Sequence, residues 1–331
     1  MKPHLSIIGS GSFATALVKA FSDNGSSNIH WWVKRPSLRE EILENKHNPQ
    51  YLSSVTISLD ESQISSELNE IIEIGDWILL AVPAAFIKNE LASLKPSQFE
   101  GKKIITVIKG MIPDSHQLIA DYLHSDFLIP YSQIIVLTGP CHAEEIAQEK
   151  LSYLTLASLD KELSQDLGKM LRTPYIRTEF SLDIFGTEYA SVLKNIMSLA
   201  SGIFHGLGYG DNFQAVFISN AIQEMDRFLN QLYPLNRDIK DSAYLGDLLV
   251  TAYSQFSRNR TFGNMIGKGY SVKSAQLEMN MIAEGYYASA SIQDIIEKNQ
   301  LEMPILECVY RILYKGANPR KEMNKLHSFL H

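Results

Sequence analysis

The chain has 331 residues, of which 45% are hydrophobic and 20% are charged. This composition is typical of folded globular proteins and excludes a largely disordered or low-complexity chain. The formal net charge of −7 argues against general binding to nucleic acid or to anionic membranes, because both favour basic surfaces. The length predicts two domains, each large enough to bury its own core.

The two cysteines, Cys141 and Cys308, are too few and too far apart in the sequence to predict a disulfide framework. No residues have the spacing of metal ligands, so we expect no metal site. No apolar stretch is long enough to span a membrane, and the apolar start predicts a strand entering a turn rather than a signal peptide. We therefore expect a protein of the reducing cytoplasm with no integral membrane segment and no nucleic-acid partner.

The first half alternates short apolar runs with helical patterns, which predicts an α/β domain with a doubly wound, mostly parallel sheet of the Rossmann type. Ligands of such sheets bind beyond the carboxyl ends of the strands, so the residues that follow each strand are candidate site residues. The predicted strands are residues 5–8, 29–33, 77–82, 104–108, 134–137 and 153–157.

The first predicted strand runs into a glycine turn, which in turn runs into a helix. In this turn Gly9 permits a tight bend, Gly11 lets backbone amides approach a pyrophosphate, and the small Ala14 allows close packing of helix and strand. The phosphates would then lie at the positive end of a helix. An ordinary tight turn is the alternative, but the position at the first strand favours a dinucleotide site.

The second predicted strand is followed by Lys34 and Arg35. An NAD-selective enzyme typically presents an acidic residue to the adenine ribose at this place, whereas cations suit the 2′-phosphate of NADP. The sequence therefore predicts NADP or NAD as the cofactor with a preference for NADPH, and Arg35 as the main contact.

The pattern changes to helical periodicity after about residue 183, which predicts a domain boundary there. We therefore expect a dinucleotide-binding domain at 1–182 and an all-helical domain at 183–331, the latter as the substrate and catalytic domain because candidate catalytic residues lie in it. Asp211 and Gln214 have the spacing of a helix-opening capping box. The glycines between residues 202 and 210 predict a close turn before that helix. The polar tail from Gly316 predicts a turn at Asn318 and Pro319.

Two segments of the helical half carry residues suited to catalysis. Lys194 shares a helical face with small residues, so a ligand could approach its ammonium, and a partly desolvated lysine can exchange a proton with a substrate oxygen. The alternative is a surface lysine whose stem covers apolar neighbours. Asp247 precedes a segment in which Arg258 stands between the hydroxyl of Ser257 and the amide of Asn259. The arginine offers planar donors for a phosphate. A polar loop is the alternative there.

Together these segments resemble the bacterial type of NAD(P)-dependent glycerol-3-phosphate dehydrogenase. The resemblance covers nearly the whole chain in order, and several spaced motifs are more specific than one glycine turn. The matching segments are residues 9–17, Val82-Pro83, Lys109-Gly110, Gly139-Pro140, 143–145, 193–195, 208–212, 246–248, 257–260 and 283–285.

The resemblance implies reversible reduction of dihydroxyacetone phosphate to sn-glycerol 3-phosphate for glycerophospholipid synthesis, with Lys194 as proton donor and acceptor. It implies a small phosphorylated substrate as the ligand and is compatible with a homodimer. The implied substrate residues are Lys109, Gly139, Cys141, Lys194, Asp247, Ser257, Arg258 and Asn259. The cofactor residues are Gly9, Gly11, Ser12, Phe13, Ala14, Lys34, Arg35, Pro83, Lys109, Ala143, Arg258 and Glu284.

One departure from the family pattern concerns the substrate site. Cys141 stands where family members commonly carry serine or threonine, so a weaker thiol donor replaces a hydroxyl. Two other readings stay open: a two-domain dehydrogenase acting on a β-hydroxy acid or a 2-oxo acid, and an NAD(P)H-sensing module without turnover.

Overall fold

The computed structural model describes residues 2–279 and 283–331. Contacts divide the chain into two compact units. The first unit comprises Met1–Ile108 and Ile119–Ile184, and the second comprises Lys109–Leu118 and Phe185–His331. The first unit is thus interrupted in the sequence, because the segment after its fifth strand belongs to the helical unit.

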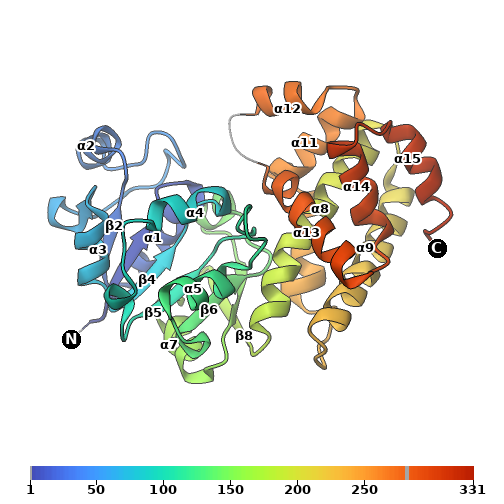
Figure 1. The fold of residues 1–331 in the computed structure, drawn as a ribbon. Coiled ribbons are helices and arrows are strands. Elements are labelled where there is room, and N and C mark those ends of the chain that lie inside the picture. The colour runs from blue at the N-terminus through green and yellow to red at the C-terminus, as the bar shows by residue number, and fades with distance from the viewer. Residues whose placement is uncertain (1, 280–282) are drawn as a thin grey trace. The chain divides into compact units, whose positions relative to one another are not determined.

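The first unit contains one sheet, which has eight strands in the described residues, in the order β3-β2-β1-β4-β5-β6-β7-β8 (Figure 1). Neighbouring strands are parallel except β6 and β7. The elements of this unit are β1 (His4–Ile8), α1 (Ser12–Asn24), β2 (Asn28–Trp32), α2 (Pro36–Asn45), β3 (Ile64–Ser65), α3 (Leu68–Ile74), β4 (Trp77–Leu80), α4 (Ala84–Leu91), β5 (Lys103–Thr106), α5 (Ile119–Phe127), β6 (Ile134–Thr138), α6 (Ala143–Ala147), β7 (Ser152–Ala157), α7 (Lys161–Leu171) and β8 (Ile176–Ser181).

Helices cover both faces of this sheet, as the residues of β1 show. Successive side chains of a strand point to opposite faces. On β1, Leu5 and Ile7 enter the core that includes the buried face of α1. Between them, the Ser6 hydroxyl donates a hydrogen bond to the Ile71 carbonyl of α3, 2.6 Å away. The strand order reverses direction between β1 and β4, and this reversal is where sheets of this kind bind ligands.

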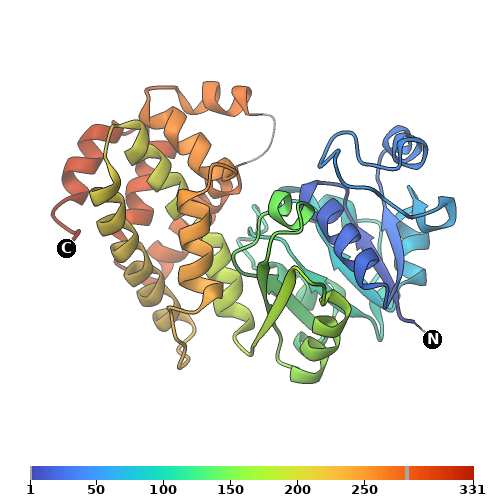
Figure 2. The ribbon, with the colours of Figure 1, turned by 180° about the vertical axis from the view of Figure 1, so that it is seen from behind.

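In its described part the second unit contains helices joined by loops and no strand (Figures 1 and 2). Its central helix, α8, is buried on every side from residue 186 to residue 204, as expected for a helix surrounded by others. The helices are α8 (Ile184–Gly206), α9 (Asp211–Leu232), α10 (Asp247–Tyr253), α11 (Arg258–Gly267), α12 (Val272–Glu278), α13 (Glu284–Asn299), α14 (Pro304–Tyr314) and α15 (Pro319–Leu326), and a π-helical turn at Ser242–Gly246 leads into α10.

The predicted fold class, a doubly wound Rossmann-type sheet followed by an all-helical part, is confirmed. The sequence did not predict β3 or β8. Strand β3 has two residues, and β8 (IRTEFS) is a polar edge strand without the apolar run that marks the others. In the described residues no helix is both long and apolar enough to cross a membrane.

Three local predictions in the helical half were wrong. Gly202 lies inside α8 instead of in a turn. The Gln214 side chain bonds Ser201 across the helix pair, so it forms no capping box with Asp211. Asn318 caps α15 with its side chain and Pro319 is the first residue of that helix, which is a favoured place for proline.

Candidate active site

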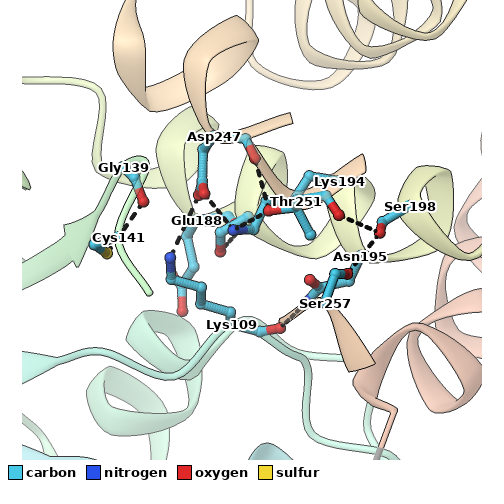
Figure 3. Close-up of polar contacts among 11 residues, drawn as sticks. Lys109, Gly139, Cys141, Glu188, Lys194, Asn195, Ser198, Asp247, Thr251 and Ser257 are labelled. Atoms are coloured by element: carbon cyan, nitrogen blue, oxygen red, sulfur yellow. Dashed lines mark hydrogen bonds and ion pairs between the residues drawn. The ribbon is translucent and has the colours of Figure 1, made fainter. Parts of the chain in front are cut away.

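The site of the second unit is built around the carboxylate of Asp247, the first residue of α10. Its side chain is 2% exposed. One carboxylate oxygen accepts a hydrogen bond from the Lys194 ammonium of α8, and the other lies 3.4 Å from the Lys109 ammonium (Figure 3). One buried anion therefore holds two cations, and removing any one of the three charges would leave another poorly compensated.

Thr251 fixes the direction of the lysine ammonium. Its hydroxyl donates to the Asp247 carbonyl, 2.7 Å away and one helical turn earlier, and accepts from Lys194 Nζ at 3.0 Å. Because this hydroxyl has one proton and that proton is already used, it presents a lone pair to the ammonium. Thr251 was not predicted from the sequence, although its spacing of four residues from Asp247 on a helix is a usable signal.

A second polar group joins the lysine helix to α11. The hydroxyls of Ser198 and Ser257 lie 2.9 Å apart, and Ser198 donates to the Thr251 carbonyl at 2.8 Å. Ser257 also accepts from the Arg260 N–H as the N-cap of α11. With its own proton given to Thr251, Ser198 accepts the Ser257 proton, so a chain of hydrogen bonds connects the start of α11 with the lysine site.

Asparagines complete this region. Asn195 donates through Nδ2 to the Lys109 carbonyl at 2.7 Å and so holds the backbone of that lysine. Asn259 accepts the Gly285 N–H at 2.9 Å, at the start of α13. Arg258 is the exposed first residue of α11, and the partly buried Glu284 is the first residue of α13. The contacts thus link four predicted residues, Lys109, Asp247, Lys194 and, through Thr251 and Ser198, Ser257, while Asn259 bonds Gly285.

The remaining predicted substrate residues belong to the first unit. Gly139 follows β6 with a φ of +103°, a conformation that favours glycine. The buried Cys141 thiol donates to the Gly139 carbonyl at 3.1 Å. Ala143 then begins α6.

The glycine turn after β1 has a conformation that favours glycine. Gly9 has a φ of +118°, and a Cβ there would lie 2.6 Å from the Ala81 carbonyl oxygen, just beyond β4. The turn therefore lies at the reversal of strand order. Pro83, at the other side of this reversal, is the N-cap residue of α4.

The start of α1 is suited to an anion. Gly11 is the N-cap of this helix, has no side-chain cap, and would have open space around an added Cβ. The first turn, which contains Ser12, Phe13 and Ala14, carries no acidic residue. Backbone amides at such a helix end bind phosphate. These residues fit the pyrophosphate of a nicotinamide dinucleotide.

Side chains that were not predicted from the sequence hold the turn in this shape. The buried Trp31 indole donates to the Gly9 carbonyl at 2.7 Å. Asn48 donates to the Ser10 carbonyl at 3.0 Å and to the Thr15 hydroxyl at 2.9 Å. These partners come from distant segments, so no local pattern could have shown them.

The cations after β2 are exposed. Lys34, whose side chain is 63% exposed, pairs with Glu90 at 2.7 Å. The Arg35 guanidinium donates to the Gln50 side chain. Both contacts lie at the surface, so a ligand phosphate could compete with them at little cost.

A different buried carboxylate lies on α9. Glu224 is 2% exposed, and its two oxygens accept the N–H groups of Ile305 and Leu306 at 3.0 and 2.9 Å, at the start of α14. Burial raises the pKa of Glu224 to about 7, against the lowering effect of these hydrogen bonds. No lysine joins it among its described ion pairs, and Arg227 is 3.9 Å away.

The fold and this chemistry define an oxidoreductase that uses a nicotinamide dinucleotide. A family model described as NAD-dependent glycerol-3-phosphate dehydrogenase N-terminus matches residues 4–164, and the corresponding C-terminus matches residues 183–324. The chain belongs to the NAD-dependent glycerol-3-phosphate dehydrogenase family.

Relatives extend over nearly the whole chain. Glycerol-3-phosphate dehydrogenase [NAD(P)+] of Staphylococcus carnosus is 33% identical over 97% of this chain and 96% of its own length. That of Chlorobium limicola is 30% identical over 95% and 94%. The crystal structure of glycerol-3-phosphate dehydrogenase from Coxiella burnetii superposes with a TM-score of 0.90 at 28% identity, covering 98% of each chain. The chain is therefore an NAD(P)-dependent oxidoreductase.

Proposed function

We propose that the protein reduces dihydroxyacetone phosphate reversibly to sn-glycerol 3-phosphate and so supplies glycerophospholipid synthesis. The observation that carries this proposal is the buried Lys194 ammonium, held by Asp247 and Thr251 in a chain of this family. A sensing module would not require a lysine oriented in this way. The names of the relatives support glycerol 3-phosphate over a β-hydroxy acid or a 2-oxo acid as substrate.

In the proposed reduction, the residues of the glycine turn would hold NAD(P)H, which would supply a hydride for the carbonyl carbon. Lys194 gives a proton to the carbonyl oxygen as the negative charge develops there, and in the reverse direction it takes the proton of the alcohol. Asp247 and Thr251 hold the ammonium in place during this transfer. Lys109 adds a positive charge beside the same carboxylate and stabilises an anionic substrate.

The substrate phosphate would bind at the start of α11. Arg258 provides a planar set of donors there, and the ten-residue helix adds its N-terminal amides. Ser257 and Asn259 flank the arginine and are held by Ser198 and Gly285. Gly139 and Cys141 are also proposed as substrate residues, and Glu284 as a cofactor residue.

Cofactor binding is proposed at the glycine turn of the first unit, through Gly9, Gly11, Ser12, Phe13 and Ala14, with Pro83 and Ala143 after neighbouring strands. We infer that Lys34 and Arg35 favour NADPH over NADH. We also infer a cytoplasmic location, which the low cysteine content of the chain, two residues in 331, supports. The homodimeric state stays a prediction for sedimentation equilibrium to test.

The test is the loss of reduced-nicotinamide absorbance with dihydroxyacetone phosphate, measured with NADPH and NADH in parallel and compared with a 2-oxo acid. We expect turnover with the phosphorylated ketone alone. Binding of either cofactor without turnover would instead support a sensing module, and turnover of the 2-oxo acid alone would support the other dehydrogenases.

The variant Arg258→Ala tests the phosphate site in the same assay. We expect KM for dihydroxyacetone phosphate to rise by roughly 10- to 100-fold, because a hydrogen bond to a charged group contributes about 1.5–3 kcal/mol. Arg258→Lys should recover only part of this loss, since an ammonium lacks the planar fork. An unchanged KM in Arg258→Ala would refute this role for the arginine.

A further inference from the structure

Helices α8 and α11 approach each other through glycines from both sides. A Cβ added at Gly202 of α8 would lie 2.1 Å from the Arg260 carbonyl oxygen. A Cβ added at Gly263 of α11 would lie 2.0 Å from the Leu199 carbonyl oxygen. Non-bonded carbon and oxygen atoms do not approach each other this closely, so alanine at either place would force the helix backbones apart.

The contact continues one turn further along both helices. Gly206 and Gly267 are each four residues beyond the first pair, and their added Cβ atoms would lie 2.4 and 2.2 Å from the carbonyl oxygens of Asn264 and Ile203. Two glycines four residues apart on each helix therefore make a reciprocal contact along one stripe. No side chain separates the backbones of α8 and α11 at these places. The distance between the two helices therefore cannot be kept by a change of side-chain rotamer when an atom is added.

Each helix carries one part of the proposed site. Lys194 lies on α8 about two turns before Gly202, and the phosphate-binding residues form the start of α11, before Gly263. Between the glycine contact and the lysine, the Ser198–Ser257 hydrogen bond joins the same two helices. The distance from proton donor to phosphate site is thus fixed by backbone contact and by one buried hydroxyl pair.

We propose that Gly202 and Gly263 are positioning residues that match the spacing between the lysine ammonium and the phosphate site to a three-carbon ketone phosphate. This inference rests on the proposed function. A ligand anchored by its phosphate presents its carbonyl to Lys194 only if that spacing is right. A ketone without a phosphate has no such anchor and depends less on the spacing.

The measured quantity is the ratio of kcat/KM for dihydroxyacetone phosphate to kcat/KM for dihydroxyacetone. In Gly263→Ala we expect the first value to fall about 100-fold, the loss typical of a misplacement of about 1 Å, and the second by about tenfold or less. Gly210→Ala is the matched control, because a Cβ there meets open space. An equal fall for both substrates in folded Gly263→Ala would overturn the proposal.

A pair of serine variants decides the question if Gly263→Ala does not fold, since they add no atoms. Ser198→Ala removes the hydroxyl that bonds Ser257, whereas Ser201→Ala removes one that bonds Gln214 and the Ala252 carbonyl instead. We expect the ratio to fall about fivefold in Ser198→Ala and to stay unchanged in Ser201→Ala. Equal ratios in the two variants would overturn the proposal. Failure of the proposed function would show earlier, as absence of turnover in the unaltered protein.

Discussion

The cations after β2 and the cations around Asp247 lie in opposite environments, since the first are exposed to water and the second surround a buried carboxylate. The Lys34 side chain is 63% exposed and pairs with the partly buried Glu90, whereas the Lys194 side chain is 5% exposed and pairs with a buried aspartate. Water screens the first contact and is excluded from the second. An exposed cation can therefore adjust which ligand binds, while a buried, oriented cation can take part in a reaction.

The largest effect should come from Lys194→Ala. We expect kcat to fall by roughly two to four orders of magnitude, the range for loss of a positioned general acid, with little change in cofactor affinity. Single-turnover reduction of dihydroxyacetone phosphate and titration with NADPH measure the two quantities. A kcat near that of the unaltered protein would remove the lysine from its proposed role and break the comparison.

Asp247→Asn should have the next largest effect. The substitution keeps the shape of the side chain but leaves two ammonium groups without their shared anion. We expect kcat to fall by about 100-fold and the free energy of unfolding to fall by about 3 kcal/mol, as for other broken buried pairs. Steady-state kinetics and urea unfolding test both. An unchanged free energy of unfolding would show that the buried ion pairs of Asp247 contribute no more to stability than exposed pairs do.

Arg35→Ala should have a small and selective effect. We expect KM for NADPH to rise about fivefold and KM for NADH to stay the same, since an exposed ion pair contributes up to about 1 kcal/mol. Arg172→Ala, which removes another exposed arginine of the same unit, is the control. Equal weakening of both cofactors would contradict the assignment of Arg35 to the 2′-phosphate.

Glu224→Gln should leave kcat unchanged and alter only the pH dependence of stability. The pKa of Glu224 is raised from 4.5 to about 7, so the folded state holds the proton more tightly than the unfolded chain does. The resulting stability is complete below about pH 4.5 and is lost as pH rises through about 7, by up to about 3 kcal/mol.

Urea unfolding between pH 4.5 and 8 measures this loss. The decrease of the free energy of unfolding with rising pH should become smaller in Glu224→Gln. It should persist in Glu278→Gln, a control at an exposed glutamate of α12. A change in kcat would show that a buried charge without a lysine partner also serves the reaction. An unaltered slope would show that Glu224 does not set this pH dependence.

The sequence predicted the parts of the site that lie in local patterns. Gly9 and Gly11 stand where a strand passes into a helix, and Lys194 stands on a face of small residues. The sequence could not pair Lys194 with Thr251, or Trp31 with the turn, because such contacts depend on tertiary packing. The glycine contact between α8 and α11 was missed for the same reason, and Gly202 was assigned to a turn because glycine is common there.

The position of Trp31, which holds the glycine turn, determines what tryptophan fluorescence reports when the protein unfolds. All three tryptophans, Trp31, Trp32 and Trp77, lie on strands β2 and β4 of the first unit. Intrinsic fluorescence will therefore report the melting of the sheet, while far-ultraviolet circular dichroism will be weighted towards the helices of the second unit. Coincident transitions would indicate one cooperative unit, and separate transitions would give each half its own stability.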